Sequence, residues 1–257
     1  PKPTPAPLPK QVHQLKVPTA GAPAPTEMES HAVAEWKIAE APDALPLQLD
    51  AGDAGLKVEE MLLCTEFRDV LFEAHSLDPQ KRMHLGEAIA QKAAELSRNL
   101  PLGELERAEL QSSGSRLVLR FEPKRCLFVR TNTKARPPVL EPGAALDAQT
   151  WLAQPRLTRG LLAAAILAPG GQVLPQSFVP DYPADVVHTM AREAGRLLDI
   201  SLKFAFAAWQ VRLLYSRSQI YALRRQDGVT LCAFLLRDGH DVPSIQRFYE
   251  GFKGVRS

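Results

Sequence analysis

Several residue combinations in this chain have the types that site chemistry requires but not the spacing. Gly170-Gly171 invites comparison with phosphate loops, yet the Walker pattern needs a following Lys-Ser/Thr, and the dinucleotide pattern needs three spaced glycines that open a helix. His84 and Glu87 share one helical face, but no second pair at ligand spacing accompanies them. No Gly-x-Ser-x-Gly nucleophile motif occurs. We therefore expect no catalytic, cofactor-binding or metal-binding residues, no cofactor, and no enzymatic activity.

The paired carboxylates and the cysteines have simpler explanations than catalysis. Glu59-Glu60 and the Glu104/Glu106 pair flank strand-like runs, where solvated strand edges account for them better than acid/base work does. The three cysteines lie far apart in the sequence, each within an apolar stretch, at positions 64, 126 and 232. An odd count without a C-x-x-C pair argues against a disulfide framework or a structural zinc site. We expect small buried side chains in a reducing compartment, and hence a cytoplasmic protein.

Five residues are the candidates for interaction with a partner. Arg212, Arg217, Arg224 and Arg225 alternate with apolar residues in strand-like runs. They form either a basic face for an acidic partner or the polar side of a sheet, and the alternation favours the polar side. Trp36 interrupts a Pro-rich segment in the stretch AEWKIAE. It either docks on the folded part or serves as a short recognition motif, and docking or a simple linker is favoured because a single Trp is thin evidence.

Composition excludes two classes of partner. The net charge is +2, no run of five or more Lys/Arg residues occurs, and aromatic residues make up 7% of the chain, which is too few for a nucleic-acid stacking platform. The most apolar run, LLAAAILA at positions 161–168, is far shorter than the roughly 20 residues that cross a bilayer. We expect no nucleic-acid binding and no membrane span.

The chain divides into a Pro-rich segment and two globular units. Residues 1–54 carry alternating prolines and few large apolar residues, which is typical of a flexible, partly polyproline-like linker or tail. Residues 55–136 and 137–257 then show the same order of elements, offset by about 103 residues. Each unit reads as two strands, a long helix and a three-stranded meander.

This order predicts an α/β fold of the α+β type. Each unit is expected to form a five-stranded, mainly antiparallel sheet with a long helix on one face, and the second unit gains short flanking helices. The run LLAAAILA is expected to be the first strand of the second unit, followed by a turn at Pro169-Gly170-Gly171. Its continuous apolar character predicts that both faces of that strand are covered.

The second unit resembles the Roadblock/dynein light chain domains, which are relatives of longins and profilins. The resemblance rests on TWLAQPRLTRGLLAAAILAPGGQVL, on the helix ending AREAGRLL, and on QVRLLYSRSQIYALRRQDGVTLCAFL. The first unit looks like a degenerate copy, in which EFRDVLFE replaces the glycine turn. The family implies non-enzymatic modules that dimerise and serve as platforms for small Ras-like GTPases or larger complexes. Two copies in one chain suggest an intramolecular pseudo-dimer or a homo-oligomer.

Two functions follow from these observations. The first is a protein-interaction scaffold that serves as a platform or regulator for a small Ras-like GTPase or a larger complex. The alternative is a sensory, profilin- or PAS-like α/β module that holds a small molecule between helix and sheet. The small residues of LAAAILA leave room for such a ligand.

Overall fold

The computed structural model describes residues 57–66, 68–98, 100–143, 146–154, 159–238 and 242–256. By its contacts the chain divides into residues 1–44 and residues 45–257, and every residue described here belongs to the second of these units. The Pro-rich segment 1–54, with Trp36, lies outside the described residues.

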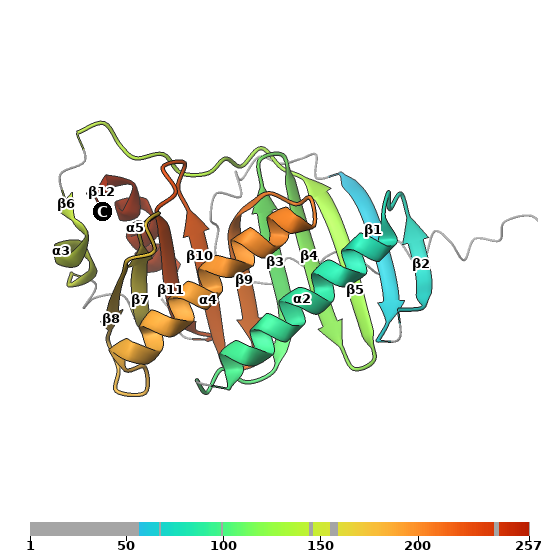
Figure 1. The fold of residues 1–257 in the computed structure, drawn as a ribbon, viewed down its shortest axis with the longest axis horizontal. Helices are drawn as coiled ribbons and strands as arrows, with labels where there is room; N and C mark the ends of the chain where they lie inside the picture. The colour runs from blue at the N-terminus through green and yellow to red at the C-terminus, as the bar shows by residue number, and fades with distance from the viewer. Residues whose placement is uncertain are drawn as a thin grey trace, which may run out of the picture. The chain divides into compact units, whose positions relative to one another are not determined.

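Ten antiparallel strands form one continuous sheet (Figure 1). Across the sheet they are β2 (Val70–Ala74), β1 (Val58–Thr65), β5 (Arg125–Asn132), β4 (Ser115–Glu122), β3 (Leu105–Ser112), β9 (Ala208–Tyr215), β10 (Ser218–Arg224), β11 (Thr230–Leu236), β7 (Leu161–Leu167) and β8 (Val173–Ser177). Strands β2, β1, β5, β4 and β3 form the first half of the sheet, and strands β9, β10, β11, β7 and β8 form the second half.

The sequence predicts a five-stranded sheet for each unit, and the structure places all ten strands in a single sheet. Strands β3 and β9 pair along their length, with Ala108 opposite Leu213 and Leu110 opposite Val211. If β3 or β9 were unpaired, it would expose a row of backbone N–H and C=O groups. Their pairing forms hydrogen bonds with these groups in both halves. The strand order β2-β1-β5-β4-β3 of the first half is matched by β8-β7-β11-β10-β9 when the second half is read from its own edge.

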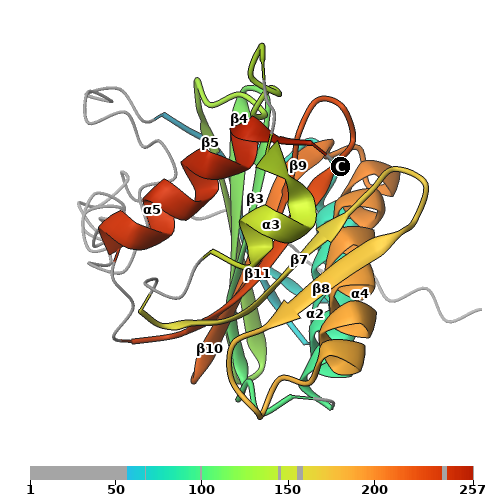
Figure 2. The ribbon, with the colours of Figure 1, turned by 90° about the vertical axis from the view of Figure 1, so that its left-hand side faces the viewer.

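Two long helices cover one face of the sheet, which we call the helix face (Figures 1 and 2). They are α2 (Pro79–Ser97) and α4 (Ala184–Lys203). Asp78 caps α2 by accepting a hydrogen bond from the Lys81 backbone N–H, and Pro79 occupies the first turn, where a missing N–H costs nothing. The helices contact each other, and Lys92 of α2 lies 2.8 Å from Glu193 of α4.

A single hydrophobic core lies beneath both helices and continues from the first half into the second. In the first half, Gly86 of α2 packs against Phe128 so closely that a Cβ at this glycine would lie 2.6 Å from the ring. Across the joint, the hydroxyl of Tyr215 in β9 donates to the carbonyl of Ala93 in α2 at 3.1 Å. The two halves therefore share backbone pairing, apolar core and side-chain hydrogen bonds.

The opposite face, called the outer face, is covered in the second half by elements that flank β7 and β11 (Figure 2). They are α3 (Ala148–Leu152), α5 (Val242–Gly251), a short 3-10 helix (Phe252–Gly254), and the parallel pair β6 (Leu146–Asp147) and β12 (Val255–Arg256). Trp151 stacks on Phe248 with ring centroids 4.4 Å apart. Ala163 and Ala165 of β7 face the helix-side core, and Ala164 faces the outer core. The prediction that both faces of this strand are covered is confirmed.

The first hairpin of the first half forms without a glycine turn. Strands β1 and β2 pair antiparallel, with Leu63 opposite Phe72. In the connecting turn, Arg68 takes a left-handed conformation with φ of 67°, and the Thr65 N–H donates to the Asp69 carbonyl at 2.9 Å. An arginine thus adopts a conformation more often left to glycine.

Candidate functional site

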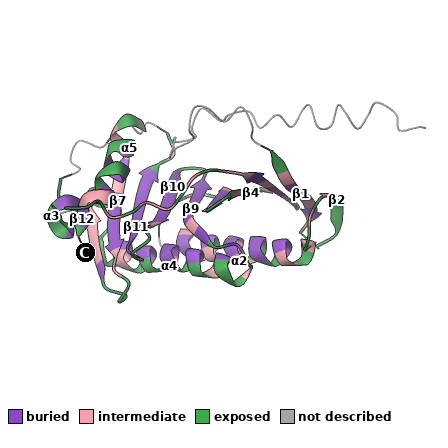
Figure 3. Ribbon diagram, turned by 90° about the horizontal axis from the view of Figure 1, so that it is seen from above, coloured by how far each residue is buried: buried purple, intermediate pink, exposed green. Residues whose placement is uncertain are grey.

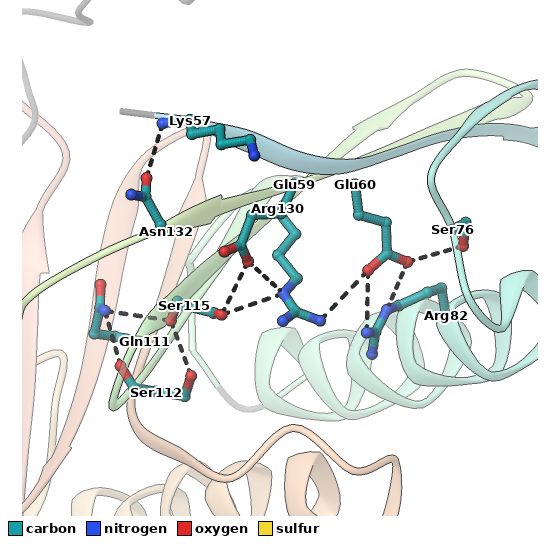
Figure 4. Close-up of polar contacts among 10 residues, drawn as sticks. All are labelled: Lys57, Glu59, Glu60, Ser76, Arg82, Gln111, Ser112, Ser115, Arg130 and Asn132. Carbon is teal, nitrogen blue, oxygen red and sulfur yellow. Dashed lines mark hydrogen bonds and ion pairs between the residues drawn. The ribbon is translucent and has the colours of Figure 1, made fainter. Parts of the chain in front are cut away.

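A buried ion pair joins β1 to α2 (Figure 4). Arg82 Nε and Nη2 lie 2.9 and 3.1 Å from the two carboxylate oxygens of Glu60, and the Ser76 hydroxyl donates to the same carboxylate at 2.8 Å. The interpretation of Glu60 as a solvated strand edge is therefore wrong, since only 3% of this residue is exposed. Its carboxylate is held by fixed donors, so it stabilises the packing of α2 on the sheet.

Glu59, the neighbouring carboxylate, is held in a partly buried network beside this pair (Figure 4). Arg130 Nε lies 3.0 Å from Glu59, and the Ser115 hydroxyl donates to Glu59 at 3.2 Å. Arg130 also lies 3.8 Å from Glu60. These contacts link β1, β4 and β5, so both glutamates are part of the framework of the first half.

Arg212 lies at the joint between the halves, on the outer face, and is 2% exposed. Its Nη2 donates to Gln219 Oε1 at 2.8 Å, and its guanidinium lies 5.3 Å from the centroid of the Tyr221 ring. Across the β3–β9 pairing it faces Glu109, with Nη1 3.7 Å from the carboxylate. The residue singled out for partner contact is therefore enclosed within the sheet.

Glu109 is the common carboxylate of three arginines at this joint. Arg116 Nη2 lies 2.7 Å from Glu109 Oε2, and Arg107 forms a further ion pair with Oε1. Burial acts to raise the pKa of Glu109, but the charges of Arg116, Arg212 and Arg107 outweigh it and hold that pKa below its ordinary value. Burial, together with the neighbouring arginine charges, lowers the pKa of Arg107. We call these four residues the joint cluster.

Arg225 fixes the C-terminal segment. Its Nη1 donates to the carbonyls of Phe252 and Val255 at 2.8 and 2.6 Å, and its Nη2 lies 2.7 Å from Asp227 Oδ2. The guanidinium also lies 4.6 Å from the centroid of the Phe252 ring. This arginine is 2% exposed, so its described contacts are internal.

The four predicted arginines do not lie on one surface. Arg217 is exposed in the turn between β9 and β10, and Arg224 lies on the helix side, where its Nη1 is 2.9 Å from Asp199 of α4. Arg212 and Arg225 are buried against outer-face partners. Trp36 lies outside the described residues. The structure thus separates residues that the strand pattern grouped together.

Two cysteines that are far apart in sequence lie opposite each other. Cys64 of β1 pairs with Cys126 of β5 in the sheet register, and both line a groove of about 280 Å³ beside α2. Burial raises the pKa of both thiols, and it raises the pKa of Cys232 to about 12. A thiol with a raised pKa is a poor nucleophile at neutral pH.

His84 and Glu87 meet an arginine on the surface of α2. Glu87 accepts hydrogen bonds from Arg68 at 2.6 and 2.8 Å, and His84 Nε2 lies 3.3 Å from Arg68 Nη1. Within the described ranges no group of three or more His, Cys, Asp or Glu side chains is placed to hold a metal ion. In the same ranges, no helix is both long and apolar enough to cross a membrane.

The edge strand β2 exposes apolar side chains at one end of the sheet (Figure 3). Among the described strands its only neighbour is β1, and Leu71 and Phe72 are 53% and 48% exposed. At the other end of the sheet, β8 carries Pro175 in its middle, and a proline hinders pairing along an edge. β2 contains neither proline nor lysine, so it is the less protected of the two edges.

The chain was compared with protein-family models, with curated proteins and with solved structures. No protein-family model and no curated protein matches the chain. Among solved structures, the chain is similar to a Roadblock/LC7 domain from Streptomyces avermitilis, with a TM-score of 0.34 and 16% sequence identity. The alignment covers 42% of this chain and 92% of that one.

Proposed function

We propose that this chain is a non-enzymatic scaffold that binds a protein partner along the open edge of its sheet. The observation that carries the proposal is strand β2, with Leu71 and Phe72 exposed and no described strand on its outer side. An edge strand offers a row of backbone donors and acceptors to an extended segment of another protein, and its side chains add apolar contact. The partner segment that fits is an extended strand with apolar residues.

The two halves are two copies of one unit, arranged as an intramolecular pseudo-dimer. Support comes from their shared strand order, from the pairing of β3 with β9, and from the core beneath both long helices. Because β3 and β9 already pair within the chain, the outermost strands remain for contacts with other molecules. Small-angle scattering of residues 55–257 is expected to give one compact particle, and two extended, separate domains would contradict this arrangement.

A small Ras-like GTPase is the partner class that the resemblance of the second unit suggests. The test is affinity capture from the native host, with nucleotide-exchange and GTP-hydrolysis assays on any GTPase recovered. Capture is run in parallel with the wild-type protein, the double variant L71K/F72K and the control L77K. Leu77 follows β2 and is 93% exposed, so L77K adds a lysine near the edge without altering the strand.

The comparison of the variants decides whether β2 carries binding. Lysine on an edge strand opposes strand addition, so we expect a partner to be retained by the wild type and by L77K but lost with L71K/F72K. Equal recovery with all three would contradict docking at β2. Sedimentation of the purified protein identifies the case in which the partner is a second copy, because self-association would then also be lost in L71K/F72K.

Small-molecule binding between helix and sheet is the second candidate function. The observation that favours it is the pair of grooves, of about 280 and 410 Å³, that border α2 and α4, since the larger one has the volume of known small-ligand sites. Mass spectrometry of the protein purified under native conditions separates the two functions. A metabolite that co-purifies in the absence of any retained protein partner would favour this one.

A further inference from the structure

The larger groove, of about 410 Å³, is lined by three arginines. It lies in the second half, between α4 and the turns that follow β7 and β10. Arg192 and Arg196 come from α4, Arg224 comes from the end of β10, and Asp199 is the only carboxylate among the described residues that line the groove. The lining therefore carries an excess of positive charge. We call it the arginine groove.

Arg224 is held in place before any ligand arrives. Its Nη1 lies 2.9 Å from Asp199 Oδ1, its Nε donates to Thr230 Oγ1 at 3.2 Å, and its Nη2 donates to the Gly195 carbonyl at 3.4 Å. These contacts occupy three of the five guanidinium hydrogens and leave the others for an acceptor. They also engage Asp199, which reduces its repulsion of an anion.

Arg192 and Arg196 lie one turn apart on the same face of α4. Like charges at this spacing destabilise a helix slightly. Arg196 forms an ion pair with Glu193, whereas the Arg192 side chain is exposed and has no hydrogen bond or ion pair among the described residues. Glu193 pairs with Arg196 and with Lys92, so the charge of Arg192 is left for an added anion.

Glycines give the arginine groove a backbone floor. A Cβ at Gly195 would lie 2.9 Å from Leu167 Cδ2, so α4 packs closely against β7 at this glycine. Gly228, in the turn after β10, has φ of 85°, a conformation that favours glycine. Three of the residues that line the groove, Gly171, Gly195 and Gly228, carry no side chain beyond the backbone.

The corresponding groove of the first half has different chemistry. It lies between α2 and the β4–β5 turn, and its lining includes Cys64, Cys126, Phe121 and Phe128, together with charges of both signs. The fold alone therefore does not place three arginines beside a long helix. The arginine groove is a property of the second half's own residues.

We propose that the arginine groove binds the phosphate group of a small phosphorylated molecule. Guanidinium groups match phosphate in geometry, bind it through paired hydrogen bonds, and stay charged at any physiological pH. The volume leaves room for a small organic group attached to the phosphate. This proposal does not depend on the docking of a protein at β2, because the groove lies in the other half of the sheet.

Titration calorimetry with pyrophosphate, at low salt, tests the proposal. The wild-type protein is compared with R192Q/R196Q, with R224Q, and with the control R98Q/R247Q. Arg98 and Arg247 are exposed and lie on α2's end and on α5, so the control removes the same charge as the first double variant. Thermal melting of each variant establishes that it is folded.

We expect the wild-type protein to bind pyrophosphate saturably at one site. The affinity is expected to fall at least tenfold in R192Q/R196Q and in R224Q, because a charge-assisted hydrogen bond contributes about tenfold or more. In the control the affinity is expected to change less than threefold. Absence of saturation would overturn the proposal. Equal weakening in the control would also overturn it, since that result describes attraction to the overall charge. If R224Q melts early, R192Q/R196Q alone decides the outcome, because both its residues are exposed on the helix.

Discussion

Replacing Glu109 by Gln is expected to destabilise the joint between the two halves severely. The substitution keeps the shape of the side chain but leaves Arg107, Arg116 and Arg212 without the carboxylate that they share. Glu109 is 7% exposed, so solvent compensates little. Removing one partner of a buried ion pair costs about 3–5 kcal/mol, and the lower end applies because the amide oxygen of the substituted side chain still accepts one hydrogen bond.

Urea unfolding followed by circular dichroism measures this loss. With a slope of about 2 kcal/mol per molar urea, a loss of about 3 kcal/mol moves the midpoint down by about 1.5 M. The matched control is Glu59→Gln, whose carboxylate is about one-third exposed and pairs with Arg130, and for which we expect a loss of about 1 kcal/mol or less. Equal midpoints for E109Q and E59Q would refute the assignment of the joint cluster as a buried, mutually dependent network.

The dependence on pH gives a second readout of the same carboxylate. The pKa of Glu109 is lower in the folded protein than in the unfolded chain, so its contribution to stability is present above the unfolded-state pKa and is lost as the pH falls through the folded-state pKa. The stability difference between wild type and E109Q is therefore expected to be constant from about pH 5 to 7 and to shrink below about pH 4. A difference that stays unchanged at about pH 3 would contradict the stated charge state.

Three further predictions follow from individual contacts. Gly86→Ala places a Cβ against Phe128 and is expected to cost about 1–3 kcal/mol in urea unfolding, whereas Gly170→Ala, with open space around it, should stay within about 0.5 kcal/mol. Arg225→Met removes the donors to the Phe252 and Val255 carbonyls, so hydrogen exchange of the backbone amides that follow α5 should accelerate. Unchanged exchange would argue against the anchoring role of Arg225. Cys64 and Cys232 are buried and the pKa values of their thiols are raised, so both should react with a thiol reagent at neutral pH only after unfolding; rapid labelling of either in the native protein would contradict their burial.

Local elements of this fold follow well from the sequence. Leu117, Leu119 and Phe121 alternate with Arg116, Val118 and Arg120, which predicts β4, and both leucines are buried beneath α2. Asp78-Pro79 marks the start of α2, where the aspartate caps the first turn. These features depend on residues close together in the chain, and periodicity and capping record such short-range relations directly.

The joining of the two sheets depends on long-range relations that no local pattern records. The pairing of β3 with β9 brings together residues about 100 positions apart in the sequence, as Glu109 and Arg212 illustrate. The same limit explains why Cys64 and Cys126 are neighbours despite their distance in sequence. Arg82 lies on the buried side of α2 together with Met83 and Leu85. A charged side chain among apolar residues on a buried helix face indicates a buried partner of opposite charge, and here that partner is Glu60.

Candidate interaction residues were harder to predict because strand alternation does not reveal what covers each face. Arg212 and Arg225 occupy positions that suit a solvent-exposed polar face, yet outer-face elements and the joint cluster enclose them. The exposure of β2 depends on its place at the end of the sheet, and that place is set by the tertiary arrangement.

Hydrogen–deuterium exchange of the β2 amides, with and without the captured partner, tests the scaffold proposal most directly. In the free protein the amides of Val70–Ala74 that point away from β1 are expected to exchange rapidly, because no described strand pairs with them. Addition of a partner strand would form new backbone hydrogen bonds there, so the account predicts slowed exchange across β2 and little change across β8. A complex in which the β2 amides exchange as fast as in the free protein would contradict docking at this edge.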